Sequence, residues 1–260
     1  MKRGTACVTL RESAAYCPDV FREGFRRLGY NVTNHAGSFG PDDVLLVWNR
    51  RPCEEHMIRA AEARGARVLV AENGYIGKDA DGHKLFALAL GHHSGAGDWV
   101  SGDYDRWTPL GIGLRPWRDD GDHILVLGQR SIGEKGVAMP EGWAERTVAD
   151  LQKRTRREVR IRRHPGISRT DPYEDLRGAW AAVTWNSGAA IKALIAGFPV
   201  FHAAPHWIGG PAASPHLDQL EEPWTGDRFP MLHRLAWAQW TRAEIASGEA
   251  LWWLLGGVRP

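Results

Sequence analysis

The chain has 260 residues, enough for one large domain or two small ones. With 43% apolar residues, 25% charged residues and a formal net charge of +2, it cannot belong to the collagen, coiled-coil or disordered classes. Three cysteines, an odd number, favour a reducing compartment over a disulfide-built secreted domain. No run of about 18 apolar residues occurs, so we expect a cytoplasmic protein without a membrane span.

The first half of the chain alternates short apolar runs with amphipathic segments. Phe21, Phe25 and Leu28 recur at helical spacing, and Gly29 follows as a stop signal. This alternation is typical of βαβ units and of a mostly parallel sheet. Strands are predicted at residues 6–10, 44–48 and 67–71, and helices at 20–28 and 54–64.

The pattern dissolves into Gly, Asp, Pro and Trp between residues 91 and 121 and then restarts, which predicts a linker between two domains. In the second half, strands are predicted at 124–127, 159–162, 181–185 and 199–201, and helices at 142–154, 173–177, 188–196, 231–240 and 243–255. The predicted fold is therefore α/β, with two Rossmann-like domains, residues 1–115 and 116–260, that face a cleft.

Polar residues follow three predicted strands of the second half. Open α/β sheets bind ligands beyond the carboxyl ends of their strands, so these residues are candidates for one site. Ser187 is a natural N-cap, and the positive end of the helix that follows could bind an anion, although an ordinary capped helix has the same sequence. The candidate residues are Gly128, Gln129, Arg130, Arg163, His164, Asn186, Ser187 and Gly188.

The first half offers a second group at its strand ends. Glu72 directly follows the strand predicted at 67–71, where it is either a general base for an acceptor hydroxyl or a turn carboxylate. His92 could hydrogen-bond a substrate or act as the base in its place. Asn49, Arg50, Asn73 and His93 complete this group.

Other chemistries lack their usual marks in the sequence. Neither a Walker-type phosphate loop nor a Gly-x-Ser-x-Gly elbow occurs, which argues against P-loop ATP chemistry and serine hydrolysis. The adjacent His92 and His93 have no second Cys/His cluster at ligand spacing, so no metal site is predicted.

Two segments resemble a known family. His164-Pro165 follows one predicted strand, and residues 186–200 read Asn-Ser-Gly-Ala-Ala-Ile-Lys-Ala-Leu-Ile-Ala-Gly-Phe-Pro-Val. These features look like GT-B glycosyltransferases, and most closely like capsule-type Kdo transferases, which carry a His-Pro motif and a Ser-x-x-x-x-E-A-L-x-x-G-x-P-V segment. Lys192 stands where that pattern has Glu. The family's Glu-Asp-Gly signature is similar to Glu72-Asn73-Gly74, with Asn73 in place of the acid.

The resemblance covers roughly residues 67–203 and implies that the two halves of the chain bind different substrates. The second half would bind a nucleotide-sugar donor through the eight residues named above, and the first half would bind the acceptor through Asn49, Arg50, Asn73 and His93. Glu72 and His92 would be the catalytic residues. The nucleotide sugar is then a co-substrate, and neither a cofactor nor a metal is required.

Three alternatives for the function stay open at this point, and the small size of the chain, with no amphipathic anchor identified, favours the first, DNA. Small GT-B enzymes of bacterial viruses glycosylate hydroxymethylated pyrimidines in DNA, and Arg22, Arg26, Arg27, Arg50 and Arg51 offer cations for duplex DNA in the host cytoplasm. The second acceptor class is a bacterial surface polysaccharide or a lipid-linked glycan. The third alternative is a nucleotide-binding or glycan-binding module without catalysis.

Overall fold

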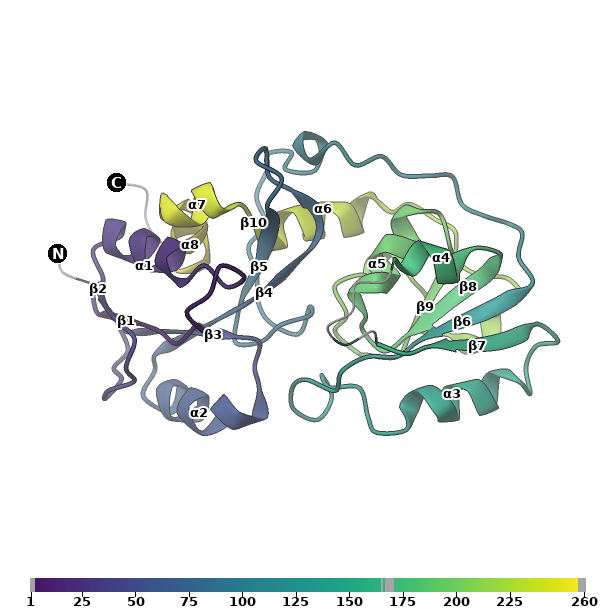
Figure 1. Cartoon of the computed structure of the whole chain (residues 1–260), viewed down its shortest axis with the longest axis horizontal. Coiled ribbons are helices and arrows are strands. Elements are labelled where there is room, and N and C mark those ends of the chain that lie inside the picture. The colour runs from purple at the N-terminus through teal and green to yellow at the C-terminus, as the bar shows by residue number, and fades with distance from the viewer. Residues whose placement is uncertain (1–2, 165, 167–170, 257–260) are drawn as a thin grey trace. The chain divides into compact units, whose positions relative to one another are not determined.

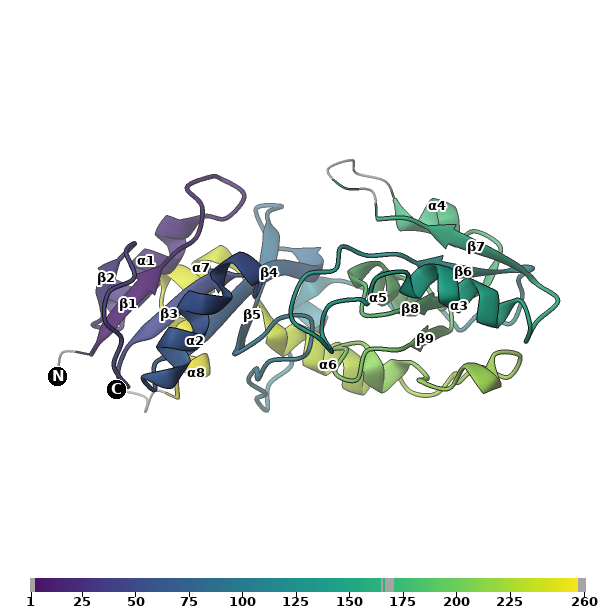
Figure 2. The ribbon, with the colours of Figure 1, turned by 90° about the horizontal axis from the view of Figure 1, so that it is seen from below.

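The computed structural model describes residues 3–164, 166 and 171–256, which form two compact units (Figures 1 and 2). Unit 1 comprises the described residues of Met1–Leu110 and Ala236–Pro260, and unit 2 is Gly111–Leu235. This division differs from the predicted 1–115 and 116–260 mainly at the C-terminal side. The reason is that the segment from Ala236 onward adds a strand and two helices to the first sheet and none to the second.

Unit 1 is built on a mixed sheet with the strand order β10-β5-β4-β3-β1-β2. Strands β1 to β4 pair in parallel, whereas β5 and β10 pair antiparallel at one edge. The strands are β1 (Thr5–Val8), β2 (Asn31–Thr33), β3 (Val44–Trp48), β4 (Arg67–Lys78), β5 (Lys84–Leu90) and β10 (Gln239–Trp240). The helices are α1 (Pro18–Arg27), α2 (Glu55–Ala63), α7 (Arg242–Ala246) and α8 (Glu249–Leu254).

Helices cover both faces of the unit 1 sheet. Phe21 and Phe25 of α1 pack in one apolar cluster with Ile245 of α7 and Leu251 of α8. Ile58 of α2 belongs to a separate cluster with the side chains that point the other way from β1, β3 and β4. Figure 1 shows α2 on one side of the sheet and α1, α7 and α8 on the other.

Unit 2 contains a fully parallel sheet with the strand order β7-β6-β8-β9. Helix α3 packs on one face through Trp143 and Leu151, and α5 contacts β8 and β9. The strands are β6 (His123–Leu127), β7 (Glu158–Arg162), β8 (Ala179–Thr184) and β9 (Val200–His202). The helices are α3 (Trp143–Leu151), α4 (Pro172–Leu176), α5 (Gly188–Ile195) and α6 (Phe229–Ala238), whose residues from Ala236 onward belong to unit 1.

The largest departure from the predicted elements is the β4–β5 hairpin. The strand predicted at 67–71 continues to Lys78 and turns back into β5, which the sequence did not predict. Gly74 permits this pairing because a Cβ at that position would lie 2.7 Å from the carbonyl oxygen of Leu85. Glu72 is therefore a strand residue, paired with Ala87, and not the first residue of a loop.

The C-terminal helical prediction also needed a correction. The helix expected over 243–255 is two short helices, α7 and α8, separated at Gly248, whose φ of 87° is left-handed. Gln239 and Trp240, expected at the end of a helix, form β10 because they pair with Ala87 and Phe86 of β5. In the described ranges, no helix combines the length and apolar character needed to cross a bilayer.

The contact between α1 and α7 depends on a glycine. A Cβ at Gly24 would lie 2.0 Å from the carbonyl oxygen of Ile245 and 3.0 Å from Cδ1 of Leu251. We expect Gly24→Ala to lower the free energy of unfolding by about 2 kcal/mol or more, because backbone must shift to admit the methyl group. Urea denaturation measures this effect. Gly37→Ala is the control, since nothing lies within 4 Å of a Cβ there, and equal midpoints for the two variants would contradict the packing described.

Candidate functional site

Three of the segments predicted to bind the donor meet at the carboxyl edge of the unit 2 sheet. Because β6, β7 and β8 are parallel, the residues that follow Leu127, Arg162 and Thr184 all leave the sheet at the same edge. The backbone N–H of Gly128 donates to the carbonyl of Arg162 at 2.9 Å, which joins the first two segments directly.

Gln129 and Asn186 lock the first segment to the third. The amide nitrogen of Gln129 donates to Oδ1 of Asn186 at 2.5 Å, and the backbone N–H of Asn186 donates to Oε1 of Gln129 at 2.8 Å. Nδ2 of Asn186 and the indole N–H of Trp185 both donate to the carbonyl of Val137, at 3.0 and 2.8 Å. These bonds make Gln129 and Asn186 positioning residues that fix the loop between β6 and α3.

Helix α5 begins at this edge with an open N-terminus. The Ser187 hydroxyl accepts a hydrogen bond from the backbone N–H of Ala189 at 3.1 Å, as expected of an N-cap. The Ser187 N–H in turn donates to Oγ1 of Thr184. Gly188 is exposed, and a Cβ there would have nothing within 4 Å. The positive end of the helix dipole is thus accessible to an anion.

Arg130 and His164, from the loops that follow β6 and β7, lie together at the same sheet edge. Nη2 of Arg130 donates to the carbonyl of Gly166 at 2.9 Å, and its Nε lies 3.4 Å from Nδ1 of His164. Because Nδ1 of His164 also accepts from the N–H of Gly166 at 3.0 Å, a neutral imidazole carries its proton on Nε2. Burial, and then the charges of Arg130 and Arg162, lower the pKa of His164. Pro165 of the His-Pro motif lies outside the described residues.

The two arginines at the end of β7 point to different helices. Arg162 pairs with Asp175 of α4 at 2.6 Å, and Arg163 lies 3.6 Å from Glu145 of α3. Alternation along the strand places them on opposite faces. Arg163 is largely exposed, so its guanidinium remains accessible at the rim of this edge.

Sequence reasoning missed His202, the last residue of β9. It pairs in register with Thr184 of β8 and so lies at the same carboxyl edge. Its ring lies 5.6 Å from the ring of Trp207. The rule that selected the other strand ends, applied to residues 200–202, would have found it.

In unit 1, the half-buried Glu72 is the centre of the predicted catalytic group. Its Oε1 accepts hydrogen bonds from the Tyr75 hydroxyl at 2.5 Å and from the backbone N–H of Ser94 at 2.7 Å. Burial raises the pKa of the Glu72 carboxyl, and the two hydrogen bonds oppose that effect without cancelling it. A half-buried carboxyl with a raised pKa is suited to proton transfer.

His92 and His93 lie in the loop that supplies Ser94. Their rings are 4.6 Å apart, and the backbone N–H of His93 donates to Nδ1 of His92 at 2.9 Å. Nδ1 of His93 accepts from the backbone N–H of Arg50 at 3.1 Å. A neutral His92 therefore carries its proton on Nε2, which is buried, so Glu72 is the better-placed base.

Arg50 holds this loop in place. Its five N–H donors are used by Glu55, Glu62 and the carbonyl of Gly91, at distances of 2.7 to 3.1 Å. The same ion pairs raise the pKa of the Arg50 guanidinium. Arg50 is thus a structural residue, and its guanidinium has no donor left for the acceptor that the sequence analysis assigned to it.

Asn49 and Asn73 are placed differently from each other. Asn49 adopts a left-handed φ of 53°, which Asn tolerates, and its N–H donates to the carbonyl of Ala71 at 2.8 Å. Asn73 is exposed on β4 and follows Glu72 directly, so its side chain points to the opposite face of the sheet. The structure therefore brings Glu72, His92, His93 and Asn49 together and leaves Asn73 apart.

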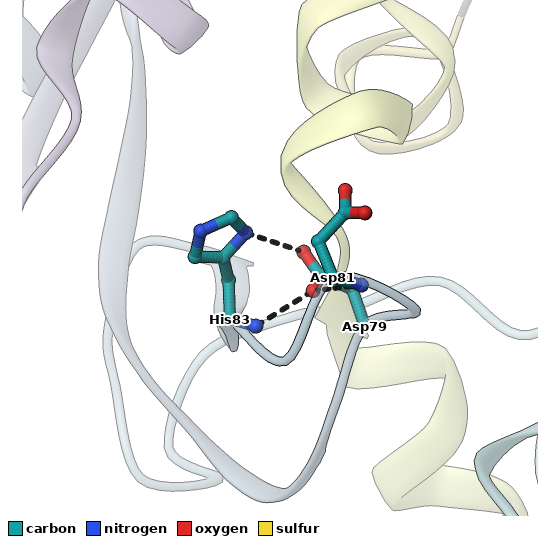
Figure 3. A group of neighbouring side chains, drawn as sticks. All are labelled: Asp79, Asp81 and His83. Atoms are coloured by element: carbon teal, nitrogen blue, oxygen red, sulfur yellow. Dashed lines mark hydrogen bonds and ion pairs between the residues drawn. The ribbon is translucent and has the colours of Figure 1, made fainter.

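The turn of the β4–β5 hairpin brings together Asp79, Asp81 and His83 (Figure 3). One potential ligand atom from each lies within 4.8 Å of the others. Oδ1 of Asp79 accepts from the backbone N–H groups of Asp81 and His83 at 3.1 and 2.7 Å, and its Oδ2 lies 3.6 Å from Nδ1 of His83. These bonds account for the arrangement as a hairpin turn, and we assign no metal to it.

A cavity of about 310 Å³ opens in unit 1 between this hairpin, residues 104–110 and α7. Two of its polar side chains, Arg106 and Gln239, already have hydrogen-bond partners. Arg106 donates to Glu244 at 2.6 Å, and Gln239 accepts from the backbone N–H of Tyr75 at 3.0 Å. These contacts tie the C-terminal segment to β4, and we assign the cavity no ligand.

The fold is the two-unit, Rossmann-like GT-B type, as comparison with solved structures shows. A β-Kdo 2,4-transferase, KpsC of Thermosulfurimonas dismutans, superposes with a TM-score of 0.56 at 13% identity, over 90% of this chain and 89% of that one. The KpsC β-Kdo 2,7-transferase of the same organism gives 0.54 at 15% identity, over 92% and 90%. No protein-family model and no curated protein sequence matches the chain.

Proposed function

We propose that this protein is a glycosyltransferase that moves a sugar from a nucleotide-sugar donor to an acceptor hydroxyl. The observation that carries the proposal is the convergence of Arg130, His164 and the open start of α5 at one sheet edge. Its counterpart is Glu72 of unit 1, a half-buried carboxyl with a raised pKa. The same fold occurs in the KpsC transferases, which supports a reaction of this class.

Unit 2 supplies the donor side of the proposed reaction. A nucleotide sugar reacts by breaking the bond between its anomeric carbon and a phosphate oxygen, which leaves with the electron pair. The Arg130 guanidinium, the Nε2–H of His164 and the start of α5 would stabilise the negative charge that develops there. Arg163, exposed at the rim, would add a further cation.

Unit 1 supplies the acceptor side. The acceptor hydroxyl would give its proton to the Glu72 carboxylate as its oxygen bonds to the anomeric carbon. His92, packed against His93, would support the loop beside Glu72. Asn49 and His93 would complete the acceptor side, with Arg50 holding their loop.

The ion pairs of unit 1 favour a glycan acceptor over DNA. Arg22 pairs with Glu12 and Asp19, Arg27 with Glu23 at 2.8 Å, and Arg51 with Glu54 at 2.6 Å. Neutralised arginines contribute little to binding a phosphate backbone. We therefore propose a hydroxyl of a surface polysaccharide or lipid-linked glycan as the acceptor, with hydroxymethylated DNA as the alternative that the experiment must test.

The test measures nucleotide release from UDP-, GDP-, dTDP- and CMP-linked sugars. Each donor is offered with saccharide acceptors, with hydroxymethylated duplex DNA and with no acceptor. We expect release that depends on a saccharide acceptor. Release only with DNA would overturn the acceptor assignment, and nucleotide binding without release under any condition would make the protein a binding module.

A further inference from the structure

His202 presents an unused hydrogen-bond acceptor at the carboxyl edge of unit 2. Its Nδ1 lies 3.0 Å from the carbonyl oxygen of Ala204, and a carbonyl only accepts, so Nδ1 carries the proton. Burial lowers the pKa of His202, which keeps the imidazole neutral at pH 7. Nε2 consequently offers a lone pair, and among the described residues it has no hydrogen-bond partner.

The strand register places His202 beside Thr184, whose hydroxyl contacts the N-cap residue of α5. His202 and Thr184 are paired, and paired residues of neighbouring strands point to the same face at a spacing of about 4.8 Å. The side chain of Thr184 reaches the backbone N–H of Ser187 at 2.9 Å. The His202 side chain therefore lies on the face of the sheet from which α5 begins, one strand further along.

The surroundings of His202 are tightly built. The Trp207 ring packs against it and is itself 2% exposed, and a Cβ at Gly209 would lie 2.5 Å from that ring. The indole N–H of Trp207 is buried without a hydrogen-bond partner in the part of the chain that the structure describes. Two polar groups without a hydrogen-bond partner among the described residues, Nε2 of His202 and the indole N–H of Trp207, therefore lie together at the end of β9.

We propose that Nε2 of His202 accepts a hydrogen bond from a ribose hydroxyl of the bound nucleotide. The inference rests on the proposed function, which places the nucleotide on unit 2 with its phosphate at the start of α5. A neutral imidazole with a lone pair on Nε2 cannot donate to a phosphate oxygen, so a hydroxyl is the nucleotide group that suits it. His202 would then distinguish ribonucleotides from nucleotides that lack this hydroxyl.

The test is calorimetric binding of CMP, UDP, GDP and ADP and of their 2′-deoxy and 3′-deoxy counterparts to the full-length protein. We expect one deoxy series to bind about fivefold more weakly, the usual effect of one hydrogen bond. His202→Asn keeps a donor for Ala204 but has no acceptor at the position of Nε2, so the ratio should fall to about one. His202→Gln extends an amide to the position of Nε2 and should restore part of the ratio.

The outcomes separate the inference from the function on which it rests. An equal loss of affinity for ribonucleotides and deoxynucleotides in His202→Asn would show a merely structural role and overturn the inference. Equal binding of both series by the unaltered protein would overturn it as well. If the unaltered protein binds no nucleotide, the proposed function fails and the inference fails with it.

Discussion

Replacing Glu72 by Gln is expected to slow sugar transfer by about 10²- to 10⁴-fold, the usual contribution of a general base. Gln keeps the shape of the side chain and can still accept from the Tyr75 hydroxyl and the Ser94 N–H. Donor binding should not change, because the donor side belongs to unit 2. The measurement is kcat together with the dissociation constant of the donor.

The pH dependence should identify the role of Glu72. Because burial raises the pKa of this carboxyl, the base form is populated only above the usual glutamate range. The transfer rate should therefore rise with pH through that raised pKa, and this limb should be absent in Glu72→Gln. The matched control is Asp81→Asn, which neutralises an exposed carboxylate in the hairpin turn. A Glu72→Gln enzyme with the unaltered rate and pH profile would refute the assignment.

Glu72→Gln should leave the free energy of unfolding unchanged or raise it, although the same substitution slows transfer. A carboxyl whose pKa is raised in the folded state stabilises the fold below its unfolded pKa, and this contribution is lost as pH rises through the folded pKa. Glu72→Gln removes that pH-dependent loss. The free energy of unfolding of the variant at pH 8 should therefore equal or exceed that of the unaltered protein, which separates lost chemistry from lost folding.

Gly188→Asp should strongly weaken nucleotide binding without harming the fold. The new carboxylate would stand at the first residue of α5, at the positive end of the helix, where it competes with and repels a phosphate. We expect the affinity for nucleotide to fall by at least about 100-fold. The melting temperature should stay equal or rise, because a carboxylate stabilises a helix N-terminus and nothing lies within 4 Å of the added Cβ.

The control for this variant is Gly188→Asn, which has the same shape without the charge. Calorimetry at two salt concentrations completes the design, because the repulsion in Gly188→Asp is screened by salt. If Asp and Asn at this position bind nucleotide equally well, α5 does not hold the phosphate.

Sequence periodicity predicted the elements whose own apolar pattern indicates burial. Residues 44–48 form β3 as predicted, and the predicted helix at 188–196 is α5 within one residue. It missed β5, whose Leu-Phe-Ala-Leu-Ala-Leu run is rich in helix formers and becomes a strand because the hairpin pairs it with β4. Pairing partners far along the chain, such as β10 for β5, leave no local signal.

The candidate site was partly predictable for a similar reason. Strand-end rules placed Gly128, His164 and Ser187 at one edge, because parallel strands share a direction. These rules did not predict which side chains form hydrogen bonds within the protein and which are available to a ligand. Arg50 donates to two glutamates and a carbonyl, and Gln129 and Asn186 bond to each other. These bonds depend on contacts between loops, which the spacing of residues in the sequence does not predict.

The discontinuity of unit 1 in the chain has a consequence for synthesis. Strands β1 to β5 leave the ribosome before β10, α7 and α8, and the 125 residues of Gly111–Leu235 emerge between them. At typical translation rates this delay lasts roughly 6 to 25 seconds. During that time the apolar cluster around Phe21, Phe25 and Phe86 lacks the side chains that β10, α7 and α8 contribute to it. The unit whose synthesis begins first is therefore completed last.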